Sequence, residues 1–238
     1  MDNWITAVLG PVLRSAADPL VVDLGYGATP VTTVELATRL RRVRSDIRVL
    51  GLEIDPLRVA AAAEATNPPA LSFAVGGFEL GGHRPVLVRA ANVLRQYDEA
   101  AAAAAWATIR AGLADGGRLV EGTCDELGRL GAWVLLDPAG PVSLTLAARI
   151  EALERPSQLA ERLPKALIHH NVPGQPIHAL LHDLDAGWAS AAPVSTFGPR
   201  QRWLAACARL EGRWPIDTRR ARYGELTVAW DAVAPGRS

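Results

Sequence analysis

A short segment near the start of the chain holds residues suited to binding a ligand. The segment is VVDLGYG, residues 21–27, in which Asp23 precedes Gly25 and Gly27. Glycine has no Cβ, so a ligand can approach the backbone closely, and a following helix directs its first N–H groups to the same point. Asp23 is placed to accept a hydrogen bond from an ammonium group or to orient the turn. By itself the motif is typical of several classes of nucleotide-cofactor protein, and also of a plain strand–helix connection.

A second acidic residue follows at a spacing that suits the sugar of such a cofactor. Glu53 ends a predicted strand and stands thirty residues after Asp23. Its two oxygens match the two hydroxyls of a ribose, and Ile54 is placed to pack on an adenine ring; the alternative is a solvated strand end. Asp55 is better explained as the cap of the next helix. Pro30 replaces the third glycine of the dinucleotide-binding fingerprint, which argues against a pyrophosphate turn.

Alternating strands and helices are predicted to position these residues. Apolar runs predict five strands, at 20–24, 48–54, 71–75, 85–90 and 118–122. Helical spacing predicts four helices, at 4–15 (with a break or kink expected at Pro11), 32–44, 56–66 and 98–113. This alternation indicates an α/β fold with a mostly parallel sheet and helices on both faces. With 238 residues, 49% of them hydrophobic, the chain is long enough to bury such a core.

The pattern changes in the second half of the chain. Runs at 132–136 and 142–147 flank a Pro- and Gly-containing turn, which predicts an antiparallel hairpin. Three helices and a last strand follow, at 156–169, 175–190, 198–211 and 225–230. We therefore expect three parts: a core at 1–150, a helical cover packed on it at 151–222, and a final strand and disordered tail at 223–238.

The combination of these segments resembles the class I S-adenosylmethionine-dependent methyltransferases. The resemblance covers roughly residues 20–147 and is carried by VVDLGYG, VLGLEIDP, LSFAVGGFEL and PVLVRAANVLRQYDE. GRLVEGT matches the fifth strand of that family, and the hairpin matches its antiparallel sixth and seventh strands. The resemblance implies a Rossmann-like, seven-stranded sheet and S-adenosylmethionine as the cofactor.

The resemblance also implies roles for individual residues. It places Asp23, Gly25, Tyr26 and Gly27 along the methionine and ribose of the cofactor. It assigns Glu53 to the ribose hydroxyls, and it assigns the adenine contacts to Ile54, Gly77 and Phe78. It places Ala90, Ala91 and Asn92 beside the methionine and the donated methyl. One departure concerns Gly77, which stands where the family often has an acidic residue for the adenine amino group, so Glu79 or backbone must replace that contact.

The acceptor of the methyl group is less well defined, and no catalytic residue is identified. Polar residues after the fourth and fifth strands are candidates for an acceptor pocket, and each is also explained as an ordinary loop residue: Arg95, Gln96, Tyr97, Glu121, Thr123 and Asp125. The segment 90–93 lacks the signature of enzymes that methylate base amines. The net charge is zero, which favours a small-molecule acceptor over RNA, and arginines at 39–48 are explained as helix-end and loop charges. The alternatives are an RNA methyltransferase, a non-catalytic cofactor-binding protein and, more weakly, a nicotinamide oxidoreductase.

The histidines, the cysteines and the apolar runs do not indicate a further functional site. His178 and His182 share a helix face but have no evident third ligand, so we expect no metal. His169 and His170 precede a turn that is a candidate to reach the acceptor pocket, with a surface role as the alternative. Two widely spaced cysteines indicate reduced thiols and a cytoplasmic protein. No apolar run is long enough to cross a membrane, and we expect a monomer or a homodimer.

Overall fold

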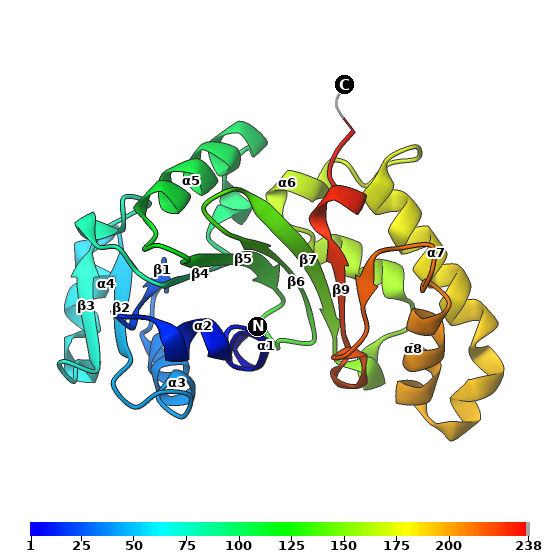
Figure 1. Ribbon diagram of the computed structural model, residues 1–238, viewed down its shortest axis with the longest axis horizontal. Coiled ribbons are helices and arrows are strands. Elements are labelled where there is room, and N and C mark those ends of the chain that lie inside the picture. Colours follow the sequence, from blue (N-terminus) through cyan, green and yellow to red (C-terminus); the bar gives the residue numbers. More distant parts are fainter. Residues whose placement is uncertain (237–238) are drawn as a thin grey trace. The chain divides into compact units, whose positions relative to one another are not determined.

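The computed structural model describes residues 1–236, so the last two residues of the predicted tail lie outside the described part. The chain has an α/β fold with one mixed sheet (Figure 1). The strands are β1 (Leu20–Leu24), β2 (Arg48–Glu53), β3 (Leu71–Val75), β4 (Leu87–Ala91), β5 (Arg118–Cys124), β6 (Leu130–Leu136), β7 (Pro141–Ala148), β8 (Ile216–Asp217) and β9 (Glu225–Ala229). The α-helices are α1 (Asp2–Val8), α2 (Gly10–Ser15), α3 (Val31–Leu40), α4 (Pro56–Ala61), α5 (Glu99–Gly112), α6 (Lys165–Ile168), α7 (Pro176–Ser190) and α8 (Pro199–Ala208).

The sheet has nine strands in the order β3-β2-β1-β4-β5-β6-β7-β9-β8. The Rossmann-like α/β class predicted from the sequence is confirmed, but the predicted count of seven strands is wrong. β9 extends the sheet beside β7, and β8 adds an edge of two residues. A two-residue strand has no periodicity that a sequence pattern can show.

Two compact units divide the chain. Unit 1 comprises residues 1–96, 100–121 and 136–140, and unit 2 comprises residues 97–99, 122–135 and 141–238. This division falls inside β5, whereas the sequence predicted boundaries at 150 and 222. The hairpin strands β6 and β7 therefore group with the C-terminal helices rather than with the parallel strands.

Unit 1 is built on parallel strands. β1 pairs with β2 on one side and with β4 on the other, and β2 pairs with β3. β1 is buried along its whole length, as its apolar composition predicts. Figure 1 shows α5 on one side of these strands and α1 to α3 on the other. The strand order reverses between β1 and β4, and such a reversal is where α/β folds bind ligands, at the carboxyl ends of the strands.

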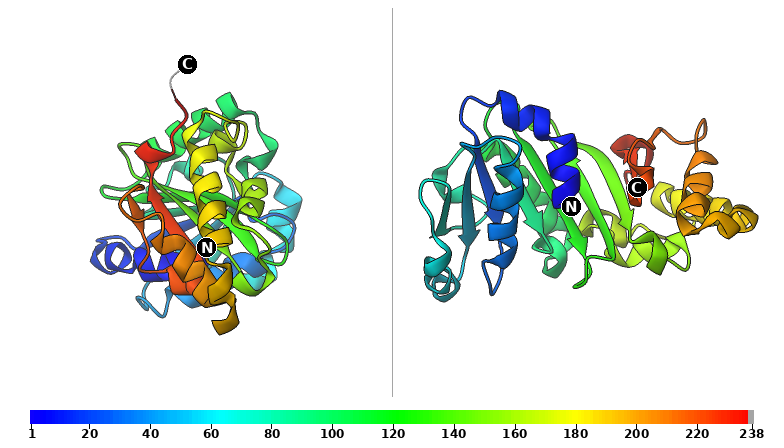
Figure 2. Two further views of the ribbon diagram at one scale, coloured as in Figure 1. Left: turned by 90° about the vertical axis from the view of Figure 1, so that its right-hand side faces the viewer. Right: turned by 90° about the horizontal axis from the view of Figure 1, so that it is seen from below.

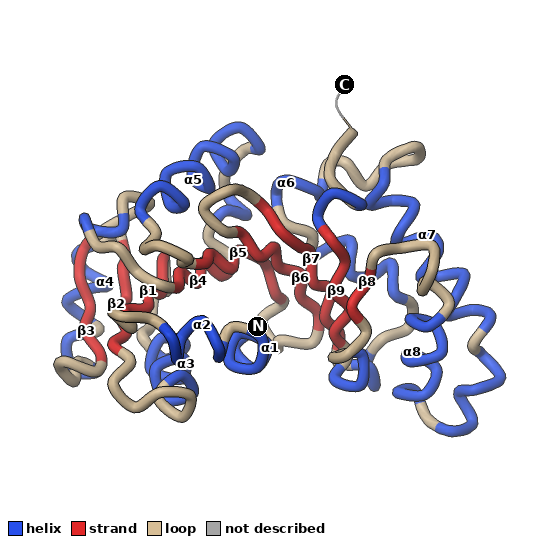
Figure 3. Tube along the Cα trace, viewed as in Figure 1, coloured by secondary structure: helices blue, strands red, loops and turns tan. Residues whose placement is uncertain are grey.

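The first helices of unit 1 differ from the predictions. The helix predicted at 4–15 is two helices, because Gly10 and Pro11 start a new one after Leu9. α3 ends at Leu40 instead of 44. Only a short 3-10 turn, Leu80–Gly82, connects β3 to β4, and Figure 3 shows this connection mostly as loop. The carboxyl end of β3 therefore continues into loop backbone.

Unit 2 combines antiparallel strands with helices. β7 pairs with β9, and β8 pairs with β9, both antiparallel. α7 and α8 lie side by side in both views of Figure 2, and a Cβ on Gly187 would come within 2.9 Å of the Ala206 carbonyl oxygen. The helix predicted at 156–169 is wrong: residues Pro156–Arg162 form a 3-10 helix, and Pro164 precedes the short α6. No helix among residues 1–236 is long and apolar enough to cross a membrane.

Candidate functional site

The turn after β1 requires both of its glycines. Gly25 and Gly27 have φ angles of +64° and +83°, which side chains rarely tolerate. A Cβ on Gly25 would lie 2.8 Å from Cγ2 of Val93, and the Gly25 N–H donates to the Leu52 carbonyl at 2.7 Å. A Cβ on Gly27 would meet no heavy atom within 4 Å among the described residues. Gly25 is thus tightly packed, whereas the space beside the Gly27 Cα is open.

Glu53 joins this turn to the end of β2. Its side chain is buried, and Oε2 accepts a hydrogen bond from the Gly27 N–H at 3.0 Å. Oε1 accepts from the Ile54 N–H at 3.0 Å, and the Arg58 guanidinium lies 3.6 Å from Oε2. Oε1 also accepts from the Asp55 N–H at 3.4 Å, so groups of the protein already engage most of the roughly four acceptor positions of this carboxylate. Glu53 therefore links the backbone of the glycine turn to the end of β2.

The loop after β3 brings a third group of residues to β2. The Gly77 N–H donates to Oε1 of Glu79 at 2.8 Å, and a Cβ on Gly77 would lie 2.9 Å from Oε2 of Glu79 and 3.6 Å from Cγ2 of Ile54. The backbone N–H groups of Gly77, Glu79 and Gly81 lower the pKa of the Glu79 carboxyl, so it is ionised at neutral pH. Ile54 is 67% exposed beside these polar groups. An exposed aliphatic side chain next to a fixed carboxylate suits a flat heteroaromatic ring with an amino group.

Asp23 lies immediately below the turn and is fully engaged within the protein. It is 1% exposed, and its register partner on β4 is Arg89. The Arg89 guanidinium donates to both carboxylate oxygens, at 2.8 and 2.6 Å, and the Thr33 hydroxyl donates to Oδ2 at 2.6 Å. Burial lowers the pKa of Arg89, but the charges of Asp23 and Asp2 outweigh burial and raise the pKa above its ordinary value. Of the two roles predicted for Asp23, this geometry matches orientation of the turn.

Tyr26 packs inside unit 1. Its ring meets the Phe73 ring edge-on, with centroids 5.2 Å apart and planes at 70°. The two rings meet over Gly51, where a Cβ would lie 2.5 Å from Cδ1 of Phe73 and 3.1 Å from Cδ1 of Tyr26. Burial raises the pKa of Tyr26, with further contributions from Glu53 and Asp23, so the phenol is neutral. No packing role was predicted for Gly51, although a glycine inside a strand often marks such a close approach.

The end of β4 holds the remaining predicted residues. Ala90 is fully buried and lies in register with Leu24 of β1, so it reaches the level of the glycine turn. Asn92 has a φ of +62°, the left-handed conformation that asparagine tolerates better than most residues. Non-glycine residues in this conformation cluster at ligand sites. Phe78, in the loop after β3, is half-buried.

Three of the candidate acceptor residues, Thr123, Asp125 and Glu121, have contacts within the protein. In unit 2, the Thr123 hydroxyl donates to the Arg162 carbonyl, and Asp125 accepts the Arg129 and Leu130 N–H groups in the turn after β5. In unit 1, Glu121 is 1% exposed; its Oε2 accepts from the Trp106 indole at 3.3 Å, and its Oε1 has no hydrogen-bond partner among the described residues. Burial raises the pKa of Glu121 to about 8.

The histidines show no clustering with other ligand residues. Nε2 of His170 lies 2.8 Å from Oε1 of Glu99, and Nδ1 of His182 lies 3.9 Å from Oδ1 of Asp183. Among residues 1–236, no three His, Cys, Asp or Glu side chains gather as metal ligands would.

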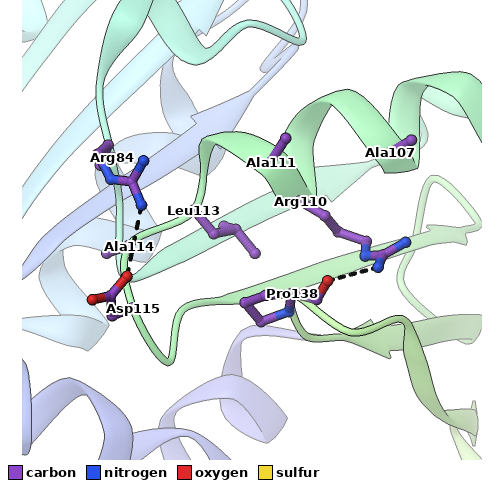
Figure 4. Close-up of a pocket in the computed structure, with 8 residues that line it drawn as sticks. All are labelled: Arg84, Ala107, Arg110, Ala111, Leu113, Ala114, Asp115 and Pro138. Atoms are coloured by element: carbon purple, nitrogen blue, oxygen red, sulfur yellow. Dashed lines mark hydrogen bonds and ion pairs between the residues drawn. The ribbon is translucent and has the colours of Figure 1, made fainter.

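A separate hollow on unit 1 lies away from the glycine turn. It is lined at the carboxyl end of α5 by Arg110 and Leu113, with Arg84, Asp115 and Pro138 around it (Figure 4). Arg84 pairs with Asp115 at 3.7 Å, and Arg110 donates to the carbonyls of Asp137 and Pro138. Arg84 and Asp115 precede β4 and β5, so this hollow is at the amino ends of those strands, opposite the expected ligand edge.

Comparison with known proteins gives structural likenesses only. No family model matches the chain, and no curated protein matches it in sequence. The fold is similar to human N-acetylserotonin methyltransferase in complex with S-adenosylmethionine, at 22% identity and a TM-score of 0.37, covering 52% of this chain and 37% of that chain. It is similar to the CcbJ methyltransferase from Streptomyces caelestis, at 20% identity and a TM-score of 0.37, covering 62% and 66%.

Two further structures show the extent of the likeness. Magnesium protoporphyrin IX methyltransferase from Synechocystis PCC 6803, with bound S-adenosylhomocysteine, is 17% identical with a TM-score of 0.39, covering 52% of this chain and 56% of that chain. LepI in complex with S-adenosylmethionine is matched over only 32% of its length. Each of these likenesses covers only part of the chain.

Proposed function

We propose that unit 1 binds S-adenosylmethionine and that the protein transfers its methyl group to a small-molecule acceptor. The observation that carries this proposal is the grouping of Gly27, Glu53, Ile54 and the Gly77–Glu79 pair at the carboxyl ends of β1, β2 and β3. The grouping supplies matching contacts for each part of an adenosine.

The sugar and the base are matched by different residues. Glu53 faces Gly27, whose bare backbone leaves room for a ribose, and its two oxygens suit the two ribose hydroxyls. Adenine presents an amino donor beside a ring-nitrogen acceptor. The Glu79 carboxylate, oriented by the Gly77 N–H, complements the amino group, and Ile54 covers one face of the ring. Glu79 thereby takes the role of the acidic residue that the family often has at the position of Gly77.

The chemistry needs little from the protein beyond alignment. When bound, S-adenosylmethionine supplies a methyl group already activated on a sulfonium. Asp23, Gly25 and Tyr26 then form the buried support of the turn, while Ala90 and Asn92 line the end of β4 toward the acceptor side. An acceptor held in line with the methyl, with water excluded, reacts without an obligatory general base.

The arginines at 39–48 support a small molecule rather than RNA as the acceptor. Arg39 pairs with Asp2 and Glu35, and Arg48 pairs with Asp18. Arg44 binds Asp46 and three carbonyls at the end of α2, and Arg41 donates to the Ile47 carbonyl. Four of the five arginines at 39–48 thus pair within unit 1, which leaves fewer guanidinium groups to neutralise a phosphate backbone.

Calorimetric titration with S-adenosylhomocysteine tests the cofactor. Glu53→Gln and Glu79→Gln each remove a charged acceptor, which costs about 1.5–3 kcal/mol, or roughly 10- to 100-fold in affinity. Glu79→Gln should also reduce the preference for S-adenosylhomocysteine over its inosine analogue. Glu64→Gln, an exposed carboxylate of the same unit, is the matched control and should bind as the wild type does. Absence of wild-type binding would refute the proposal.

Transfer of a labelled methyl group into fractionated cell extract tests the acceptor. Label in the small-molecule fraction is the expected result. Label in RNA would overturn the acceptor class and leave the cofactor in place. Cofactor binding without transfer to any fraction would make the chain a cofactor-binding protein without this activity.

A further inference from the structure

A buried chain of charges connects the N-terminal helix to the residue below the glycine turn. Arg89 stands at its centre, with a side chain 6% exposed. It donates Nε and Nη2 to Asp23, and it donates Nη1 to Oδ1 of Asp2 at 2.8 Å. The second oxygen of Asp2 accepts from Arg39 of α3 at 3.1 Å. α1 is thereby attached, through two ion pairs, to both β4 and α3.

The geometry leaves Asp23 unable to reach a ligand. Three charge-assisted or hydroxyl donors occupy its oxygens, and the carboxylate is almost fully buried. Withdrawing it from Arg89 would leave the Nε and Nη2 groups of Arg89 buried without their acceptor, which proteins avoid. Asp23 therefore acts through the backbone, two residues before Gly25.

We propose that Arg89 is a positioning residue for the turn at Gly25 and Gly27. We also propose that Asp2, by holding Arg89, makes cofactor binding depend on the N-terminal helix α1. This inference rests on the proposed function of unit 1. Arg89 fixes the Asp23 end of the turn, and Asp2 fixes the free edge of the guanidinium. Release of α1 should loosen the turn, and occupation of the turn should in return protect α1, since such coupling is reciprocal.

Two ligands separate positioning from direct contact. S-adenosylhomocysteine carries the amino-acid part with its ammonium, whereas 5′-methylthioadenosine lacks it. If Asp23 acts only on the turn, Asp23→Asn weakens both ligands by the same factor. If Asp23 binds the ammonium, only the affinity for S-adenosylhomocysteine falls, and that result would overturn the assignment.

Asp2 provides a milder test, because its side chain lies at the edge of the network and is 16% exposed. Asp2→Asn should weaken both ligands about three- to tenfold, within the range expected for couplings of this kind. Asp2→Glu, which keeps the charge, should restore most of the affinity. Glu35→Gln breaks the other Arg39 pair without touching Arg89 and is the matched control. Unchanged binding in Asp2→Asn would refute the role of α1.

Amide hydrogen exchange tests the same coupling without a ligand. In the free protein, Asp2→Asn should speed exchange at Gly25 and Gly27 while β9 in unit 2 exchanges as in the wild type. Uniformly faster exchange would indicate simple destabilisation and would overturn the positioning role. Turn loosening in a protein that binds neither ligand would refute the cofactor proposal alone. Ligand binding with an unaltered turn would refute the positioning role alone.

Discussion

Replacement of Glu121 by glutamine should change how the stability of the protein depends on pH. Burial raises the pKa of Glu121 from 4.5 to about 8, and the Trp106 hydrogen bond offsets only part of that effect. Below pH 4.5 the carboxyl is protonated in both the folded and the unfolded chain. Between pH 4.5 and 8 the unfolded chain releases the proton and the folded chain keeps it. The free energy of unfolding therefore falls by about 1.4 kcal/mol for each pH unit in this window.

Glutamine retains the size of Glu121 and an oxygen for the Trp106 indole, but it does not titrate. The substitution replaces the carboxyl group, whose Oε1 has no hydrogen-bond partner among the described residues, by an amide. This change alters the free energy of unfolding by about 1–3 kcal/mol, and by the same amount at every pH. The difference between wild type and Glu121→Gln should nevertheless move by about 2.7 kcal/mol in favour of the variant between pH 5.5 and 7.5. For a chain of this size, that is a relative shift of roughly 5–11 °C in melting temperature.

Urea unfolding at pH 5.5, 6.5 and 7.5, followed by tryptophan fluorescence and repeated by calorimetry, measures this difference. Subtracting the two proteins cancels the other titrating groups they share. Glu64→Gln removes an exposed carboxylate of unit 1 and should stay within about 0.5 kcal/mol of the wild type at each pH. If the curves for wild type and Glu121→Gln run parallel from pH 5.5 to 7.5, Glu121 is not the buried neutral acid inferred from its burial.

Two further results are expected from the same structure. Gly25→Ala should lose roughly 2–4 kcal/mol, because a strained φ and the 2.8 Å contact with Val93 act together. Gly128 has a similar φ of +63°, but a Cβ there would meet open space. Thermal unfolding should therefore show a smaller loss of stability for Gly128→Ala than for Gly25→Ala. Equal losses would contradict the packing argument. For the thiols, burial, with a further contribution from Glu211, raises the pKa of Cys207 to about 12, while Cys124 is half-buried. A thiol reagent at pH 8 should label Cys124 first in the native protein, and faster labelling of Cys207 would show that α8 opens.

Much of unit 1 was predictable because its strands are short, apolar and separated by turns. β1 and β3 have the predicted bounds, and β2 differs by one residue at its end. The glycine conformations at 25 and 27 follow from the motif itself. Local signals of this kind need no knowledge of distant residues.

The partners of the site residues were not predictable in the same way. Asp23 was assigned to an ammonium group or to the turn, and its partner Arg89 lies sixty-six residues away. The one available hint was a charged residue inside the apolar run LVRAA. Which carboxylate would pair with it depends on strand order and register, which one sequence does not specify. The cofactor contacts of Gly77, Phe78, Ala90 and Asn92 stay predictions.

The meeting of two aromatic rings over Gly51 has a consequence for how this sequence can change. Tyr26, Gly51 and Phe73 share one fixed volume on three neighbouring segments, so each side chain limits the size of the others. A methyl group at position 51 becomes acceptable only after one ring is lost, and loss of a ring alone leaves a void beneath the turn. These three positions should therefore vary together among related chains, as a compensating set rather than as independent sites.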